Sequence, residues 1–339
     1  MTDPIERARD LISADLDRFE MELFRVLEPQ KEYLTDTEFQ LYKRGKKLRP
    51  LFLLLSARLS TPTPLAELPE KAIRASVSLE MLHVATLIHD DIVDLAPTRR
   101  GMGTVFSERG AEMAVLIGDL QFIQAVRCFA EGIDTQEDMH LVRLVLDVGY
   151  QICCGELDEI MTDPTWDTRR LEERYFKTID RKTATLFGLA CESGASLCGA
   201  GKTATFCLSR FGRRFGRAFQ IMDDIFDLVR PEALSGKAQA TDLAQGRLSL
   251  PIIYALDELP EDHMVRRIIL RQAYTSDELY EAIEAVAASG GLLRSYSKAR
   301  EMVAEGLEFL MQFPTGPYRE ALADMAQHIV DRGFLQHDS

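Results

Sequence analysis

Apolar residues recur at helical spacing along almost the whole chain. Between residues 4 and 28, for example, Leu16, Phe19 and Leu23 fall on one face of a helix. No stretch of strand length alternates between apolar and polar residues. A chain with this pattern buries its apolar residues by packing helix against helix, so we expect an all-α fold. The other long helices are expected at 51–59, 69–94, 111–131, 136–161, 167–198 and 202–228, with a loop at 231–246.

Size and composition restrict the organisation and the partners. The chain has 339 residues, 46% of them hydrophobic, with no Pro-, Gly- or Ser-rich linker, which indicates one domain with a large core. A formal net charge of −14 argues against nucleic acid as a partner. No apolar run reaches the ~18 residues of a membrane span, and the N-terminus lacks the pattern of a signal peptide. The six cysteines have no metal or redox spacing, so we expect a cytoplasmic protein with reduced thiols.

One expected helix ends in a cluster of carboxylates. Asp90 and Asp94 fall on one helical face, with Asp91 at its edge and His83 nearly two turns earlier. Carboxylates this close repel one another unless a cation lies between them. Oxygen ligands select a hard ion such as Mg²⁺, which also takes substrate phosphates. For a single motif of this kind, a solvated acidic helix end is the simpler interpretation.

The same DDxxD pattern occurs a second time. Residues 219–227 read FQIMDDIFD, and they place Asp223, Asp224 and Asp227 at the same spacing. Two such clusters that face each other could hold a small group of divalent ions. Cationic side chains are distributed along the chain as well, at Lys46, Arg49, Arg99, Arg100, Lys182, Lys237 and Arg247. Carboxylate clusters together with Lys and Arg indicate a site for a polyphosphate bridged by metal.

With these motifs in order, the sequence resembles the trans-isoprenyl diphosphate synthases, the polyprenyl synthetase family. The markers are GKxxRP at 45–50, DDxxD at 90–94, RRG at 99–101, KT at 182–183, FQxxDDxxD at 219–227 and GK at 236–237. The resemblance runs from about residue 40 to residue 332. It implies a single-domain helical bundle spanning 1–339, with a central cavity lined by the two DDxxD helices. It also implies a homodimer and a cluster of about three Mg²⁺ ions on the six motif aspartates.

The resemblance also implies roles for single residues. Isopentenyl diphosphate would be held by Lys46, Arg49, His83 and Arg100. The allylic diphosphate would be held by Arg99, Lys182, Lys237 and Arg247. Thr183 and Gln220 would turn oxygens towards the developing allylic cation, so that Lys182, Thr183 and Gln220 are the expected catalytic residues. The implied reaction is head-to-tail condensation of isopentenyl diphosphate with the allylic diphosphate.

Some positions depart from the family pattern. Ala238 and Ala240 replace the usual Pro and Gly of the late GK loop, and Arg247 replaces a usual Lys. Glu159 stands where the family often has Gln. None of these changes removes a metal or phosphate ligand. Glu80 and His83 form an ExxH pair as in di-iron bundles, but such bundles need a second copy, which the sequence lacks.

Product length depends on the helix before the first aspartates. In the family the growing chain runs past the residues one and two turns earlier, here Thr86, Ala85 and Leu82. Short-chain members usually place an aromatic ring at one of the first two positions, but Ala85 and Thr86 are small. We therefore expect a product longer than geranylgeranyl diphosphate. The side chains that stop the growing chain are expected on the helix with Leu141, Leu144, Val145 and Val148, unless the ring of Phe122 closes its path earlier.

Three alternatives remain open at this stage. The chain could be a short-chain farnesyl or geranylgeranyl diphosphate synthase. It could be a non-catalytic subunit of a heteromeric synthase, although both aspartate motifs are intact. A terpene cyclase would share the first DDxxD, but it has no use for the GKxxRP motif of a second diphosphate.

Overall fold

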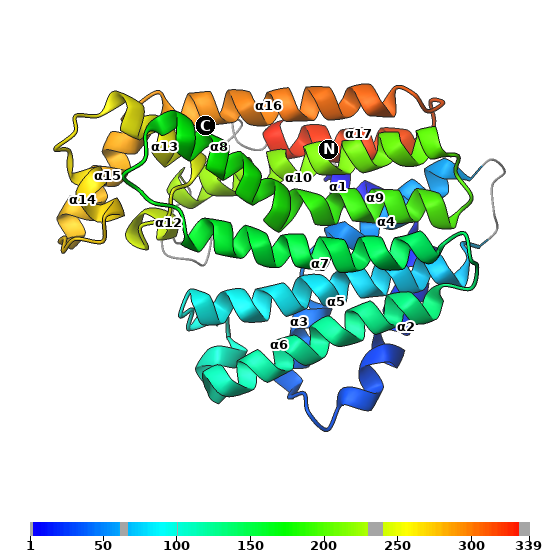
Figure 1. Cartoon of the computed structure of the whole chain (residues 1–339). Helices are drawn as coiled ribbons and strands as arrows, with labels where there is room; N and C mark the ends of the chain where they lie inside the picture. The colour runs from blue at the N-terminus through cyan, green and yellow to red at the C-terminus, as the bar shows by residue number, and fades with distance from the viewer. Residues whose placement is uncertain (1–2, 62–66, 100, 230–239, 332–339) are drawn as a thin grey trace. The chain divides into compact units, whose positions relative to one another are not determined.

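The computed structural model describes residues 3–61, 67–99, 101–229 and 240–331. Within these residues every regular element is helical except one hairpin of two short strands (Figure 1). This confirms the all-α prediction. The long helices are α2 (Ser13–Leu27), α4 (Leu48–Ser60), α5 (Glu70–Val93), α6 (Val105–Gly132), α7 (Met139–Ile160), α8 (Thr168–Ile179), α9 (Thr185–Leu197), α10 (Lys202–Val229), α15 (Ser276–Ala288), α16 (Gly291–Leu310) and α17 (Pro317–Asp331).

The shorter elements fill the connections. They are α1 (Pro4–Leu11), the 3₁₀ turn η1 (Glu28–Gln30), α3 (Asp36–Lys43), the strands β1 (Thr98–Arg99) and β2 (Met102–Gly103), the π-helical turn η2 (Asp180–Ala184), α12 (Thr241–Ala244), α13 (Leu250–Glu258) and α14 (Met264–Ile269).

The chain divides into two compact units, each assembled from three separate stretches. The first unit comprises residues 1–149, 186–212 and 309–325, and the second comprises 150–185, 213–308 and 326–339. Their boundaries fall inside α7, α9, α10, α16 and α17. The first aspartate motif belongs to the first unit and the second motif to the second unit.

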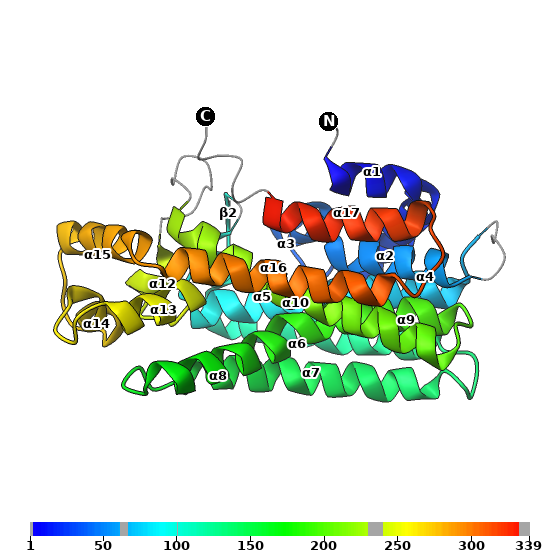
Figure 2. The same ribbon diagram turned by 90° about the horizontal axis from the view of Figure 1, so that it is seen from above.

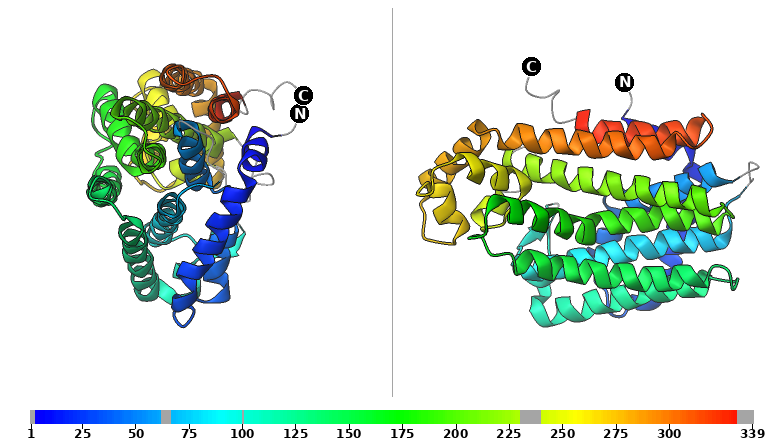
Figure 3. Two further views of the ribbon diagram at one scale, coloured as in Figure 1. Left: turned by 90° about the vertical axis from the view of Figure 1, so that its right-hand side faces the viewer. Right: turned by 45° about the horizontal axis from the view of Figure 1, so that its top comes forward.

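In the first unit α5 is the central element. It lies beside α6 along much of its length and also contacts α2, α3 and α4 (Figure 3). Its buried residues, such as Ile73, Val77 and Leu82, point to all sides of the helix, as expected for a helix surrounded by others. The rings of Phe52, Phe187 and Phe211 form a further part of this core, with centroids 5.4 and 6.0 Å from Phe52. The first aspartate motif is therefore carried by a helix that other helices surround.

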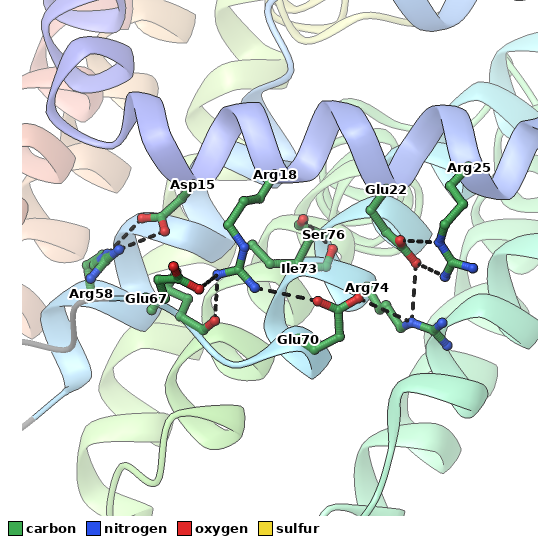
Figure 4. Close-up of polar contacts among 11 residues, drawn as sticks. Asp15, Arg18, Glu22, Arg25, Arg58, Glu67, Glu70, Ile73, Arg74 and Ser76 are labelled. Atoms are coloured by element: carbon green, nitrogen blue, oxygen red, sulfur yellow. Dashed lines mark hydrogen bonds and ion pairs between the residues drawn. The ribbon is translucent and has the colours of Figure 1, made fainter.

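Charged side chains attach α2 to this core (Figure 4). Asp15 accepts two hydrogen bonds of 2.7 Å from the guanidinium of Arg58 on α4. Arg18 donates to the carbonyl of Leu68 at 2.7 Å, and Glu22 pairs with Arg74 of α5 at 3.2 Å. Asp15 is almost fully buried, and a buried carboxylate of this kind is stable only with its cation in place.

The second unit has a core of its own around α12–α15. Leu228, Leu243, Ile252, Val265 and Val286 are all buried in it. Helices α14 and α15 lie side by side (Figure 2), and α8 packs against α13. The second aspartate motif, at the end of α10, therefore adjoins this core.

Two expected helices are interrupted. The helix expected over 4–28 breaks at Ile12, which has non-helical backbone angles, so α1 and α2 are separate. The helix expected over 167–198 contains the π-helical turn at 180–184. Inserted turns of this type frequently mark functional sites in helices. Neither break can be detected from hydrophobic periodicity, because the helical segments before and after each break both bury apolar residues.

Candidate active site

The first aspartate motif lies where α5 ends. The amide of Ala96 donates to the carbonyl of Asp91 at 2.9 Å, which closes the helix in a Schellman motif. Leu95 adopts the left-handed conformation, with φ at 50°, which is unfavourable for a residue other than glycine. This ending keeps Asp90 and Asp94 one turn apart on the same face, both half-buried, while Asp91 is only 3% exposed.

Asp91 is held by an arginine of the following hairpin. The Nε of Arg99 donates to its Oδ1 at 2.7 Å. Arg99 lies on β1, which pairs with β2 in an antiparallel register that sets Arg99 opposite Met102. The hydroxyl of Thr104 donates to the carbonyl of Ala96 at 2.7 Å and so ties the hairpin to the end of α5. The expected allylic ligand Arg99 therefore contacts the first aspartate motif directly.

The GKxxRP segment forms the start of α4. Lys46 is exposed and Arg49 is half-buried, with its guanidinium 4.8 Å from the ring centroid of Phe187. Between them Lys47 is buried and pairs with Glu80 of α5, Nζ to Oε1 at 2.8 Å. Glu80 precedes the half-buried His83 by three residues. The structure thus joins the segment with Lys46 and Arg49 to the helix that carries His83.

The second aspartate motif contains a chain of polar side chains. The hydroxyl of Thr183 donates to Gln220 Oε1 at 2.8 Å, and the amide of Gln220 donates to Asp224 Oδ1 at 2.9 Å. The hydroxyl of Tyr175 donates to the other oxygen of Asp224 at 2.6 Å. Burial raises the pKa of Asp224 to about 7, although both hydrogen bonds act in the opposite direction. The structure therefore brings the side chains of Thr183, Gln220 and Asp224 together.

The two motifs share one arrangement. In each, the second aspartate is buried and held by donors from the protein, which are Arg99 for Asp91 and Tyr175 with Gln220 for Asp224. The first and last aspartates are more accessible: Asp90, Asp94 and Asp227 are half-buried and Asp223 is exposed.

Lys182 leaves the π-helical turn towards α7. Its Nζ lies 2.5 Å from Glu156 Oε2 and 2.8 Å from Glu159 Oε2. A cation on this largely apolar helix needs a partner, and two carboxylates provide it. The approach depends on Gly155, because a Cβ there would lie 2.8 Å from the backbone nitrogen of Lys182. The close contact between α7 and the π-helical turn therefore fixes the backbone from which the Lys182 side chain extends.

Glu159 also faces the other expected diphosphate ligand. Arg247 Nε lies 3.8 Å from Glu159 Oε1. Nearby, the amide of Asp242 donates to Asp227 Oδ2 at 3.0 Å. Desolvation, together with the charges of Asp224 and Asp227, raises the pKa of Asp242 well above its usual value. This part of the second unit therefore gathers several carboxyl groups, with Lys182 and Arg247 beside Glu159.

Two site residues lie outside the described residues, and four others were missed. Arg100 and Lys237 belong to the first group. Sequence reasoning gave no role to Lys47, Tyr175, Glu156 or Asp242, which all contact or adjoin expected ligands. Lys47 stands inside the GKxxRP motif and could have been noticed there. Tyr175 carries no signal, because an aromatic residue on a helix is more often part of the core.

Comparisons with known proteins agree with these motifs. The family model for polyprenyl synthetase matches residues 31–286. Solanesyl diphosphate synthase 1, chloroplastic, from Arabidopsis thaliana is 32% identical over 325 residues, 95% of this chain and 78% of that protein. The chain belongs to the polyprenyl synthetase family. It is a trans-prenyltransferase, and the predicted reaction class is confirmed.

Two further relatives cover nearly the whole chain. Nonaprenyl diphosphate synthase from Mycobacterium tuberculosis is 32% identical over 323 residues, 95% of this chain and 93% of that protein. The crystal structure of polyprenyl synthase from Caulobacter crescentus CB15, complexed with calcium and isoprenyl diphosphate, superposes with a TM-score of 0.84. It is 27% identical and covers 97% of this chain and 98% of that one. The short-chain and non-catalytic alternatives are not favoured by these relatives.

In this polyprenyl synthetase the residues expected to set the chain length belong to the first unit. Leu82 and Ala85 are fully buried, and the hydroxyl of the half-buried Thr86 donates to the carbonyl of His83 at 2.8 Å. Leu141, Val145 and Val148 of α7 are buried as well, and Leu144 is half-buried. The ring of Phe122 lies against Gly149, 2.7 Å from where a Cβ would stand. The α7 residues and the ring of Phe122 therefore both stay predictions for the side chains that stop the growing chain.

Helix α6 is the one described helix that is long and apolar enough to cross a membrane. It satisfies that test by length and composition alone. It also packs along α5 within the first unit, with Ala114, Ile117 and Ala125 buried. Apolar core helices meet the same criterion, so α6 is not evidence of a membrane span.

Proposed function

We propose that this polyprenyl synthetase uses Mg²⁺ to extend an allylic diphosphate with isopentenyl diphosphate to a product longer than geranylgeranyl diphosphate. The observation that carries the proposal is the arrangement shared by the two aspartate motifs. Each buries its second carboxylate on protein donors and leaves its first and last carboxylates more accessible, on one helical face. The same arrangement occurs twice, far apart in sequence. Binding of a metal diphosphate explains this repetition better than the alternative that both motifs are solvated helix ends.

The donor set fits Mg²⁺. Within the described parts of the chain no three His, Cys, Asp or Glu side chains are already gathered around a metal position. Mg²⁺ does not require such a cage, because it is usually bound by one or two carboxylates together with waters and substrate phosphates. Asp90 with Asp94, and Asp223 with Asp227, supply such pairs. We propose that Asp91 and Asp224 orient these pairs, and that about three ions are bound in all.

Bound Mg²⁺ would neutralise the allylic diphosphate and make it a better leaving group. Arg99, Lys182, Lys237 and Arg247 would hold that diphosphate, while Lys46, Arg49, His83 and Arg100 hold isopentenyl diphosphate. As the C–O bond breaks, the oxygens of Thr183 and Gln220 would stabilise the allylic cation. The double bond of isopentenyl diphosphate, held close to the cation, forms the new C–C bond. A proton then leaves to the released diphosphate, so the protein needs no nucleophile of its own.

The product length rests on the small side chains before Asp90. Ala85 and Thr86 place no ring beside the path expected for the tail, and the relatives above include solanesyl and nonaprenyl synthases. Each added isoprene unit buries five carbons, a gain on the order of 3–4 kcal/mol at ~0.8 kcal/mol per carbon. Growth should therefore continue until a deeper side chain blocks it.

We also propose a homodimer built on α7. One face of this helix carries the exposed side chains of Leu146, Tyr150 and Leu157, and Met161 follows just after its end; the four are between 52% and 70% exposed. Apolar side chains at this spacing form a continuous stripe, which a protein partner would cover. Light scattering should give twice the 38.3 kDa mass of the chain. We keep the single domain over 1–339 and the cytoplasmic location as proposals; the Arabidopsis relative is chloroplastic.

The metal assignment is tested by replacing the accessible and the buried aspartates separately. Asp90→Ala and Asp223→Ala should each lower kcat by orders of magnitude while the circular dichroism spectrum stays helical. Asp91→Asn and Asp224→Asn, as matched variants, should lower the thermal midpoint and activity together, because they release buried donors. Near-normal turnover in Mg²⁺ for both alanine variants would show that the proposed site is wrong.

A further inference from the structure

A buried carboxylate on α5 has no role in the reaction described above. Glu80 is 4% exposed and lies in the interior of a helix that is surrounded by others. Its Oε1 accepts from Lys47 Nζ at 2.8 Å, and both side chains are only 6% exposed. A charge in such surroundings is stable only with its counter-ion in place, and the pair itself adds little net stability. A buried pair of this kind therefore calls for an explanation other than stability.

Lys47 stands at an unfavourable place in three respects. It occupies the N-cap of α4 but provides no side-chain cap. Its backbone is left-handed, with φ at 50° and ψ at 41°, which costs free energy for any residue other than glycine. Its positive charge lies at the positive end of the helix dipole. Strain that persists in this way needs a surrounding contact that fixes it, and the ion pair with Glu80 is that contact.

Two further cations lie close to Lys47 in the sequence. Lys46 precedes Lys47 and is exposed, while Arg49 follows in the first turn of α4 and lies over the Phe187 ring. A residue in left-handed conformation reverses the chain locally, so the direction of Lys46 depends on the backbone angles of Lys47. Since Glu80 lies three residues before His83 on α5, the ion pair also links the cations to this histidine.

We propose that Lys47 and Glu80 are positioning residues that hold Lys46 and Arg49 for isopentenyl diphosphate, an inference that rests on the proposed role of that segment. Neither side chain touches the substrate. The ion pair holds the left-handed start of α4 against α5, and the two exposed or half-exposed cations take their spacing from it. A diphosphate that binds to preset cations does not have to order them first, which preserves its affinity.

The experiment removes the charges without leaving one of them unpaired. In Lys47→Met/Glu80→Met two apolar side chains of similar length replace the pair, a change that is often neutral for stability. We expect the thermal midpoint to stay near that of the wild type. The KM for isopentenyl diphosphate should rise on the order of 10-fold, because a small displacement of binding groups is costly. The KM for the allylic diphosphate should not change.

Two controls separate the possible failures. Arg49→Ala tests the assignment itself: if it leaves the isopentenyl KM unchanged, the proposed site is wrong and the inference falls with it. Arg58→Met/Asp15→Met removes a second buried ion pair on the same helix, at its other end. It should leave both KM values at the wild-type level. An unchanged isopentenyl KM in Lys47→Met/Glu80→Met, when Arg49→Ala raises it, overturns the inference alone.

A milder variant covers the case in which the double variant does not fold. Glu80→Gln keeps the shape of the side chain and an oxygen that can accept from Lys47, but it removes the negative charge. We expect a folded enzyme with a smaller rise in the isopentenyl KM. Lys47→Arg in the otherwise wild-type chain keeps the cation, so its KM for isopentenyl diphosphate should stay near the wild-type value. A folded Glu80→Gln enzyme with wild-type KM values would contradict the proposal.

Discussion

At the scale of single residues, Asp180 shows how the π-helical turn is anchored. Its carboxylate accepts hydrogen bonds from Arg213 and, at 2.8 Å, from Arg217 Nε of α10. Burial alone would raise the pKa of Asp180, but the hydrogen bond from Arg213 and the charge of Arg217 outweigh it and lower the pKa. The next residues, Arg181 and Lys182, pair instead with carboxylates of α7. Successive side chains thus fix the turn on two sides.

We predict that Asp180→Asn lowers the free energy of unfolding at pH 7 by roughly 1.5–3 kcal/mol, since it removes a charged acceptor. The folded pKa is lower than the unfolded pKa, so the stabilisation is present above the unfolded value. It is lost as the pH falls through the folded value. The difference between wild type and variant in urea unfolding should therefore shrink below about pH 4. A difference that is independent of pH would contradict this role.

Ala85 provides the residue-scale test of product length. It is fully buried on α5, and Ala85→Phe places a ring beside the expected path of the tail. We predict a shorter product, measured by chromatography of the prenyl alcohols after dephosphorylation. Ala75→Phe, an equally enlarged buried position on the same helix, is the control for general overpacking. An unchanged product from Ala85→Phe, or the same shortening in both variants, would place the tail elsewhere.

At the scale of elements, the contact of α7 with the π-helical turn was not predictable from sequence. A cation on a largely apolar helix needs a partner, but the sequence contains no information that Glu156 and Glu159 pair with Lys182. The approach requires a glycine on one helix and an inserted residue on the other. Neither changes the hydrophobic pattern from which helices are predicted. The hairpin after the first motif was not predicted either, because strands of two residues are too short to show an alternation of apolar and polar side chains.

We predict that Gly155→Ala disturbs this contact. The added Cβ would lie 2.8 Å from the nitrogen of Lys182, so the backbone must move, at a cost of about 1–3 kcal/mol in unfolding free energy. Because Lys182 moves with it, the KM for the allylic diphosphate should rise more than that for isopentenyl diphosphate. Gly201→Ala, where nothing lies within 4 Å of the new Cβ, should change neither. Equal effects on both substrates would show that the turn does not position Lys182.

At the scale of the whole molecule, sequence predicts the helices and the reaction better than the organisation of the chain. Most long helices appear close to their expected bounds, because apolar residues recur in them at helical spacing. The division into two units of three segments each could not be predicted. It depends on which helices pack together, whereas periodicity reports only that a helix has an apolar face. The expected site residues were assigned by motif, and their protein partners were found only in the structure.

The central claim is that the chain condenses isopentenyl diphosphate repeatedly onto an allylic primer. The most direct measurement is chromatography of the product that the purified chain makes from farnesyl diphosphate, labelled isopentenyl diphosphate and Mg²⁺. We predict labelled products longer than geranylgeranyl diphosphate, and none when the metal is removed by a chelator. A chain that incorporates no label, or that stops at geranylgeranyl diphosphate or earlier, would contradict the account.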